Sequence, residues 1–462
     1  MRCGSPLGAG STRVAAARGA ARASQTALAA RGQPLLGCAP APLKESDLRA
    51  IIAISALLAS TAAAAAPPTD LVAIYRDLHE HPETAFKETR SAAILAKEAK
   101  AAGFTVTTGV GKTGVVAVLV NGPGPVLLIR TDMDALPVTE TTGLPYASLT
   151  PGTMHACGHD IHMSSWIGLA RYMSENRQKW SGTLVMIGQP AEEGVGGAKA
   201  MLEDGLYTRF PKPQFALAFH DSASLPAGQV GITDGYALAN VDSIDMTVRG
   251  IGSHGSEPQN GIDPIVIAAR IVGTLQTLVS RENDPRQPAV ITVGAFNGGT
   301  RYNIIPDEAK LMITVRSYDP VVRERLIASI RRVARAEAEA AGVPEALMPV
   351  ITRGNGSEST FNTPKMTATV TAALDKALGP DRVKRVPASM AAEDFGAFSR
   401  GLGVESTMFW VGAQPQATWD AAGGDVRKLP GLHSAKFAPD PAPTLATAVK
   451  AMAAAALSIV GK

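Results

Sequence analysis

Short apolar runs alternate along this chain with longer stretches of helical character. The runs lie at 126–129, 184–187, 215–219 and 408–411. Strands that alternate with helices are typical of an α/β fold with a mostly parallel sheet, and we predict that fold here. One helix has clear limits, because Asn362 or Thr363 can cap it, Pro364 suits its first turn and Gly379 follows its end.

The pattern changes in the middle of the chain. A length of 462 residues is more than one hydrophobic core usually holds, so two folding units are expected. The middle segment reads as strand, helix, strand, strand, helix, strand, at 243–248, 264–278, 289–296, 310–316, 321–341 and 348–351. This is the order of a ferredoxin-like α+β layer. The expected divisions are a leader at 1–66, a catalytic domain in two parts at 67–238 and 356–462, and an inserted lid at 239–355.

The first 66 residues have the pattern of a secretory signal. Lys44 and Arg49 precede a short apolar segment at 51–58, and alanines follow at 62–66. The apolar segment is too short for a stable membrane span, and the pattern predicts a periplasmic or secreted protein. About 45 residues precede it, so either the start is assigned too early or the segment is a processed extension. A low-complexity tail on a cytoplasmic protein is the alternative.

The charge and the cysteine content of the chain after residue 66 argue against nucleic-acid binding and against a disulfide. Seven of the 44 Lys and Arg residues and two of the 41 Asp and Glu residues lie in 1–66, so the remainder has a net charge of −2. No basic run remains in this part, and nucleic-acid binding is not expected. Cys157 is its only cysteine, which excludes an intramolecular disulfide there. A lone cysteine is more often a small buried apolar side chain than a reactive group, so its neighbours must decide its role.

Polar segments follow the predicted strands, at the edge where an open parallel sheet binds ligands. Asp132 and Asp134 follow the first run, and His220 and Asp221 follow the run that is predicted to end at Phe219. The other segments carry Cys157 and His159 on either side of a glycine that lets the backbone bend, Glu192 and Glu193 after a proline, and the late His433.

Thiolate, imidazole and carboxylate ligands together suit Zn, Mn, Co or Ni better than harder ions. The candidate ligands are Cys157, His159, Glu193, His220 and His433. Five side chains around one ion would leave no open coordination position for water or substrate. The same five side chains are enough ligands for two divalent ions. Any single histidine is more often a core or surface residue. However, six of the eight histidines lie beside Gly, Pro, Asp or Glu in such segments, at 79, 155, 159, 220, 254 and 433.

Glu192 and Glu193 are adjacent, and paired glutamates usually belong to a solvated helix surface. Here they follow an apolar strand and Pro190, which is an unusual place for a surface pair. Neighbouring side chains leave the backbone in different directions. One carboxylate can therefore bind metal while the other acts as a general base.

Eight segments together resemble a known motif series. They are LHEHPETAFKE (78–88), RTDMDALPVTE (130–140), MHACGHDIH (154–162), GQPAEEG (188–194), GSHGSEPQNGIDPI (252–265), NIIPD (303–307), AAEDF (391–395) and LHSAKF (432–437). In this order they are similar to the amidohydrolase subgroup of the aminoacylase and glutamate-carboxypeptidase metallopeptidases, which includes hippurate hydrolase and indoleacetyl-amino-acid hydrolases. The resemblance covers the chain from about residue 70 to its end.

The resemblance implies a domain with two metal ions and a lid that often forms a homodimer. It assigns the ligands to Cys157, His159, Glu193, His220 and His433, and the general base to Glu192. It also implies that His254 reaches a substrate or oxyanion position, commonly in the partner subunit, and that Asn303 contacts substrate. A loop histidine bonded near the helix that starts at Pro264 is the alternative for His254.

The implied activity is hydrolysis of the amide bond of small N-acyl amino acids. A dipeptidase or carboxypeptidase acting on short peptides is the alternative within the family, and a non-catalytic ligand-binding protein is the alternative outside it. All ligand positions and Glu192 are present, which argues against the last. Gly188 stands where an aromatic residue is usual in this subgroup, so the acyl group is not fixed by the resemblance.

Overall fold

The computed structural model describes residues 69–194 and 196–462. The leader predicted at 1–66 lies outside the described residues. The described chain belongs to one compact unit. The expected division into a catalytic domain and a separate lid therefore stays a prediction, and the segments are described below as two layers of that unit.

The larger layer is built on an eight-stranded sheet in the order β1-β2-β4-β3-β5-β16-β6-β14. Its strands are β1 Thr105–Val110, β2 Gly114–Asn121, β3 Val126–Asp132, β4 Gly182–Gln189, β5 Phe215–Pro226, β6 Val230–Ile232, β14 Val383–Arg385 and β16 Glu405–Gln414. The four predicted apolar runs form the central strands β4, β3, β5 and β16, which are mutually parallel.

The expectation of a mostly parallel sheet is only partly right, because the sheet is mixed. β1 and β2 pair antiparallel, as do β2 and β4, and β6 and β16. β1 and β2 are joined by the short connection 111–113, and a connection of that length can join only antiparallel neighbours.

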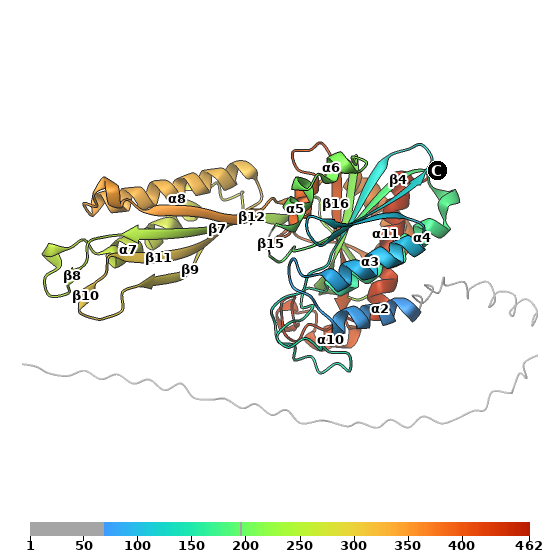
Figure 1. Cartoon of the computed structure of the whole chain (residues 1–462), viewed down its shortest axis with the longest axis horizontal. Coiled ribbons are helices and arrows are strands. Elements are labelled where there is room, and N and C mark those ends of the chain that lie inside the picture. The colour runs from blue at the N-terminus through green and yellow to red at the C-terminus, as the bar shows by residue number, and fades with distance from the viewer. Residues whose placement is uncertain (1–68, 195) are drawn as a thin grey trace, which may run out of the picture. The chain divides into compact units, whose positions relative to one another are not determined.

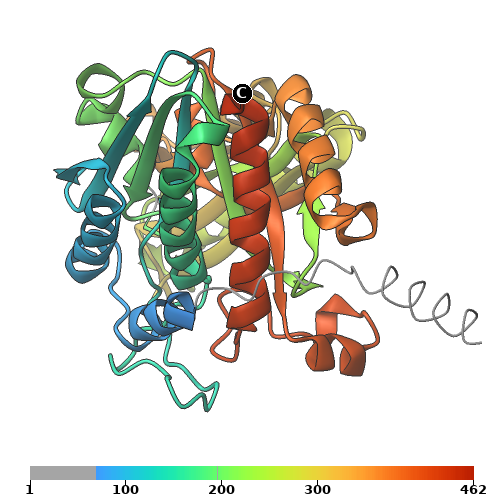
Figure 2. The ribbon, with the colours of Figure 1, turned by 90° about the vertical axis from the view of Figure 1, so that its right-hand side faces the viewer.

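Helices cover both faces of this sheet. Figure 2 shows α3 (Thr89–Ala101), α4 (His159–Glu175) and α11 (Pro441–Val460) lying over one face. α2 (Thr69–Glu80) and α9 (Pro364–Leu378) pack with them, and the other face carries α5 (Gly197–Glu203), α6 (Leu206–Arg209) and η6 (Asp394–Phe398). Residues of one strand alternate between the two cores.

Two of these helices bear on predictions from the sequence. α9 begins after Thr363 and ends before Gly379, which has a φ of 92°, so the predicted limits of this helix are confirmed. α11 is long and apolar enough to cross a membrane by length and composition, but 56% of that window is buried. It packs against α4 and α9 as a core helix.

The second layer has the predicted element order. It contains β7 Gly235–Arg249, α7 Pro264–Thr277, β9 Ala289–Gly298, β11 Glu308–Ser317, α8 Pro320–Ala340 and β12 Val350–Ser357. The strands pair antiparallel in the order β12-β7-β11-β9, and α7 and α8 share a separate core with this sheet (Figure 1). Each helix begins with an aspartate cap followed by proline, at Asp263 and Asp319.

β7 connects the two layers. Its first residues pair with β13 (Thr360–Asn362) and β15 (Ser389–Ala392), and its later residues form the second sheet. The expected boundary between 238 and 239 thus lies inside one strand. β7 has 15 residues, a length of about 50 Å for an extended strand. Beyond its Arg249 end, β8 (Ser253–His254) pairs with β10 (Ile304–Ile305) at the tip of this layer (Figure 1).

Candidate metal centre

The five predicted ligand residues come together in the larger layer. His433 Nε2 lies 3.2 Å from Cys157 Sγ and 3.1 Å from Glu193 Oε1, and His220 Nε2 lies 3.7 Å from the same sulfur. Ligand atoms of Cys157, His159 and Glu193 lie within 4.8 Å of one another. These residues come from the loop before α4, the first position of α4, the loop after β4, strand β5 and the loop before α11.

His220 and Asp221 do not follow the end of a strand, so that detail of the sequence prediction is wrong. They lie inside β5, paired with Trp410 and Val411 of β16. β5 continues to Pro226 because β16 runs beside it as far as Gln414. The alternation of side chains along the strand sends these two residues to different partners in the centre, because His220 reaches Cys157 and Asp221 reaches His162.

Backbone conformation around the centre is unusual at three positions. Gly158 has a φ of 74°, and a Cβ there would lie 2.4 Å from Asp221 Oδ2, so only glycine fits between Cys157 and His159. Ala191 and His433 also have positive φ values, of 49° and 65°. Non-glycine residues adopt such angles at a cost of about 1–3 kcal/mol each, and they concentrate at functional sites.

Asp134 holds the backbone of both glutamates. Its two carboxylate oxygens accept the backbone N–H groups of Glu192 (3.0 Å) and Glu193 (2.9 Å). Its own carbonyl oxygen lies 2.7 Å from His159 Nδ1, which donates to it and leaves Nε2 free to face the centre. The sequence indicated that Asp134 reaches this edge but gave it no role.

A second group of side chains lies beside the first and shares His159 and His220 with it. Ligand atoms of Asp132, His159, His162 and His220 lie within 4.8 Å of one another. His162 bridges two carboxylates, with Nδ1 bonded to Asp132 and Nε2 3.1 Å from Asp221 Oδ1. The sequence analysis missed His162, although it lies three positions after His159 and such residues share a helix face.

Carboxylates dominate the charge of the centre. They belong to Asp132, Asp134, Glu192, Glu193, Asp221, Glu393 and Asp394. Within the described residues, the buried Arg130 is the only Lys or Arg that forms an ion pair with this set, through Asp132, Glu393 and Asp394. Buried carboxylates in such excess need further positive charge.

Glu192 lies beside two of these groups. Its carboxylate is within 4.8 Å of those of Glu393 and Asp394. Desolvation, followed by the charges of Glu393 and Asp394, raises the pKa of Glu192 well above its usual range. A general base must be deprotonated and have a pKa near the working pH, so positive charge from bound cations is needed to lower this pKa again.

The atoms that face the centre fit divalent cations. His159 Nε2 is buried with no hydrogen-bond partner among the described residues, and Glu193 Oε1 is buried beside His433 without hydrogen-bond geometry. Burial and then Glu193 raise the pKa of the Cys157 thiol, an effect that a bound cation reverses. The thiol, imidazoles and carboxylate suit borderline-soft ions. The assignment of individual ligands stays a prediction.

His254 and Asn303 lie elsewhere. His254 is exposed on β8, where its Nδ1 contacts Ser256 Oγ at 2.6 Å. Asn303 is also exposed, and its carbonyl oxygen accepts the N–H of Gly255. These two residues are near one another, because β8 pairs with β10 directly after Asn303. Their contacts in the described chain are local to this tip and do not reach the ligand residues.

Gly188 differs from what its place in the resemblance suggested. A Cβ at this position would lie 2.7 Å from Leu95 Cδ1 and 3.1 Å from the sulfur of Met133. The position therefore faces the packed core under α3. The glycine at this position, where an aromatic residue is usual, is explained by the packing of the core. It gives no information on which acyl group the protein accepts.

Comparison with known proteins gives consistent matches. Residues 128–423 match the model of peptidase family M20/M25/M40. The chain is 40% identical over 268 residues to a hippurate hydrolase of Campylobacter jejuni, which covers 58% of this chain and 69% of that protein. It is 34% identical over 348 residues to thermostable carboxypeptidase 1 of Saccharolobus solfataricus, which covers 74% of this chain and 86% of that protein. The crystal structure of a dinuclear metal-binding peptidase of family M20 from Bacillus subtilis aligns with a TM-score of 0.68 and 30% identity, covering 84% of this chain and 98% of that chain.

Proposed function

The chain belongs to peptidase family M20/M25/M40, and from that premise we propose that it hydrolyses the amide bond of small N-acyl amino acids. Membership makes it a hydrolase of amide bonds that uses two divalent metal ions. The substrate proposal is supported by its likeness to hippurate hydrolase and to an N-acetylcysteine deacetylase of Bacillus subtilis, with 39% identity over 268 residues to the latter. The likeness to a carboxypeptidase keeps short peptides as the second candidate.

One observation carries the proposal. Cys157, His159, Glu193, His220 and His433 converge on one edge of the sheet, and Glu192 lies beside them with no salt-bridge partner among the described residues. We assign the five residues as metal ligands and Glu192 as the general base. When bound, two divalent ions supply the positive charge that lowers the pKa of the attacking water and stabilises charge on the carbonyl oxygen.

Three side chains near the ligands have separate roles in this mechanism. Asp134 fixes the Glu192–Glu193 backbone, so the two carboxylates keep different directions. Glu192 accepts a proton from the attacking water and returns it to the departing amine nitrogen. Arg130 forms ion pairs with Glu393 and Asp394 and so holds these two carboxylates next to Glu192. This side of the centre therefore consists mainly of carboxylates.

Release of free amino acid tests the substrate class. The metal-loaded enzyme would be given hippurate, N-acetylcysteine, an unmodified dipeptide and a C-terminally amidated hippurate in parallel assays. We expect a higher kcat/KM for the N-acyl amino acids than for the dipeptide. Preference for the dipeptide would favour the peptidase alternative, and no hydrolysis by protein with full metal content would contradict the proposal.

The tip of the second layer has a role in the same proposal. We assign His254 as an oxyanion donor and Asn303 as a substrate contact, both acting in a homodimer that forms through the second layer. The exposure of both residues and the exposed side chain of Tyr302 between Arg301 and Asn303 support a docking role for this tip. Sedimentation of the purified protein tests the dimer, and a monomer at micromolar concentration would argue against it.

We also propose a periplasmic or secreted location, with removal of the leader at 1–66. The support is the charged, apolar and small-residue order of that segment. Sequencing the N-terminus of the protein recovered from its natural source tests this. An intact N-terminus in the cytoplasmic fraction would leave the alternative of a cytoplasmic tail.

A further inference from the structure

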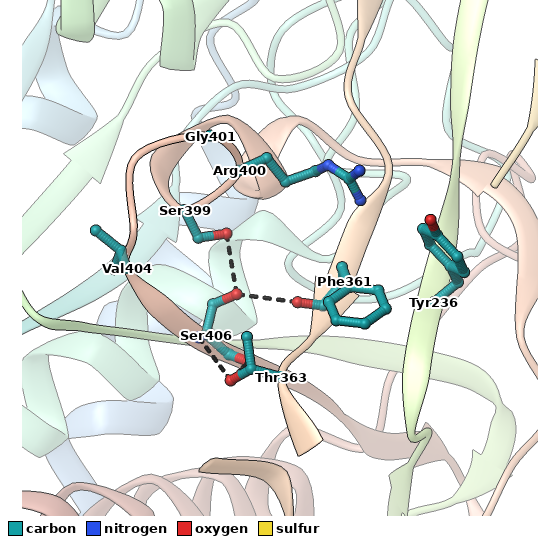
Figure 3. A pocket seen from close by; sticks show the side chains of 8 residues that line it. All are labelled: Tyr236, Phe361, Thr363, Ser399, Arg400, Gly401, Val404 and Ser406. Carbon is teal, nitrogen blue, oxygen red and sulfur yellow. Dashed lines mark hydrogen bonds between the residues drawn. The ribbon is translucent and has the colours of Figure 1, made fainter. Parts of the chain in front are cut away.

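A cavity of about 250 Å³ lies where β7 enters the second layer, apart from the metal centre. Its walls come from the first residues of β7, from β13, from the turn after η6 and from the start of β16 (Figure 3). The lining residues are Tyr236, Phe361, Thr363, Ser399, Arg400, Gly401, Val404 and Ser406. Ser406 precedes Trp410, the partner of His220, by four positions on β16, which is roughly 13 Å along the strand.

The cavity has an aromatic wall. The rings of Tyr236 and Phe361 meet edge to face, with centroids 4.9 Å apart and an interplanar angle of 73°. Tyr236 also stacks on Tyr318 at 5.8 Å, so its ring is held from behind. Rings fixed in this way present an apolar surface that can pack another planar group.

Arg400 gives the cavity a positive charge that is not fully paired. The guanidinium lies 5.6 Å from the centroid of the Tyr236 ring and faces the same space as the two rings (Figure 3). Its Nη1 donates to Ser359 Oγ at 2.9 Å, whereas its Nε lies 4.0 Å from Glu358 Oε2, beyond hydrogen-bond distance. Glu358 is bonded instead to Arg323, at 2.9 Å.

Solvent compensates this charge only in part, because the Arg400 side chain is 19% exposed. A guanidinium with several free donors in a partly desolvated place binds carboxylates well, through two parallel hydrogen bonds. The hydroxyls of Ser399 and Ser406 are bonded to each other at 2.9 Å and form a polar floor. A ligand that satisfies this lining has one carboxylate and a flat apolar body.

We infer that this cavity is a binding site for a small aromatic carboxylate, formed by Arg400 with Tyr236 and Phe361. The cavity volume of about 250 Å³ accommodates one six-membered ring with a carboxylate. The ligand would contact β7 and β13 together, the strands by which the chain enters the second layer and returns from it. The inference does not depend on the proposed function, since it concerns binding away from the metal centre.

Calorimetry on the metal-loaded protein, with benzoate as the probe, tests the site. Acetate shares the carboxylate without the ring, and inorganic phosphate is a stronger anion without the ring. We expect benzoate to bind at least about tenfold more tightly than either, because ring packing and the ion pair both contribute. Equal affinity for acetate or phosphate would overturn the assignment to an aromatic ligand.

Two variants locate the site. Arg400→Gln should weaken benzoate binding by about tenfold or more, because it removes a charged hydrogen-bond donor. The matched control is Arg385→Gln, which removes an arginine that is 55% exposed and paired with Asp234, and it should bind like the wild type. Phe361→Leu keeps the charge and removes a ring, so it serves if Arg400→Gln does not fold by circular dichroism. Unchanged affinity in a folded variant of either residue would overturn the proposal.

A crystal soaked with 4-bromobenzoate gives the position directly. We expect a bromine anomalous peak in this cavity on the side away from Arg400, because the para bromine lies opposite the carboxylate. A peak at the metal centre alone would show that benzoate binds there and not in this cavity. This experiment measures no hydrolysis. A negative result can therefore occur although the proposed function holds, and a positive result can occur although the proposed function fails.

Discussion

The metal centre holds the predicted metal ligands and general base, and the tip formed by β8 and β10 holds the predicted oxyanion donor. These two regions are built differently. At the centre, buried carboxylates and imidazoles from distant segments fix one another, as His162 does between Asp132 and Asp221. At the tip, His254 is exposed and bonded only to near neighbours. The ligands of a cation must all lie around the same ion for it to stay bound, whereas a group that acts on the transition state can be supplied by a movement or by another subunit.

The largest expected effect separates the two glutamates within the centre. Glu192→Gln should lower kcat by about a thousandfold and retain both metal ions, because it removes a general base and no ligand. Glu193→Gln should lose metal. Elemental analysis and steady-state kinetics on both variants check this, and equal metal loss in the two would show that their roles are not distinct.

The next prediction concerns the tip. His254→Ala should lower kcat by about a hundredfold and leave metal content unchanged, since a lost oxyanion donor acts only in the transition state. His81→Ala is the matched control, because His81 is a partly exposed histidine with a local bond to Asp77. Loss of metal from His254→Ala would remove the contrast between tip and centre.

Mixing inactive subunits distinguishes a partner's histidine from closure of the chain's own tip. If His254 acts in the partner subunit, a mixture of His254→Ala and Glu192→Gln should regain activity, because one site of each mixed dimer has both groups. Native mass spectrometry would establish that the mixed dimer is present. No recovery in such a sample would favour closure within one chain.

A smaller effect is expected at Asp134, which positions the backbone of the two glutamates. Asp134→Ala should weaken metal affinity by about 10–100-fold, the usual cost of losing a residue that orients a ligand. Titration against a chromophoric chelator with Zn²⁺ and Mn²⁺ measures it. Asp307→Ala is the control, because Asp307 also accepts a backbone N–H, from Gly252 in the second layer. Equal affinity in both variants would mean that the loop keeps its shape without Asp134.

The smallest effect concerns Cys157. Alkylation by iodoacetamide at alkaline pH should be at least about tenfold slower in the metal-loaded protein than after chelation, because a metal-bound thiolate is protected. Peptide mass spectrometry separates Cys157 from Cys3 and Cys38. Rapid labelling of fully loaded protein would show that Cys157 is not a ligand.

The sequence by itself determined much of the local structure and the composition of the centre. Apolar runs specified the four central strands, and Pro364 and Gly379 specified the limits of α9, because these signals act through neighbouring residues. It also pointed to Cys157, His159, Glu193, His220 and His433 as candidates for one site through their neighbouring residues, although His220 lies inside β5 and not after a strand.

Only the tertiary structure decided which groups meet. The antiparallel pairing of β2 with β4 and of β6 with β16 depends on contact between distant segments, as does the continuation of β5 past His220. The clamp made by Asp134, the bridge made by His162 and the core position of Gly188 all follow from contacts between residues far apart in the chain. Propensity and spacing carry no information on such contacts, because their geometry is fixed when the layers pack together.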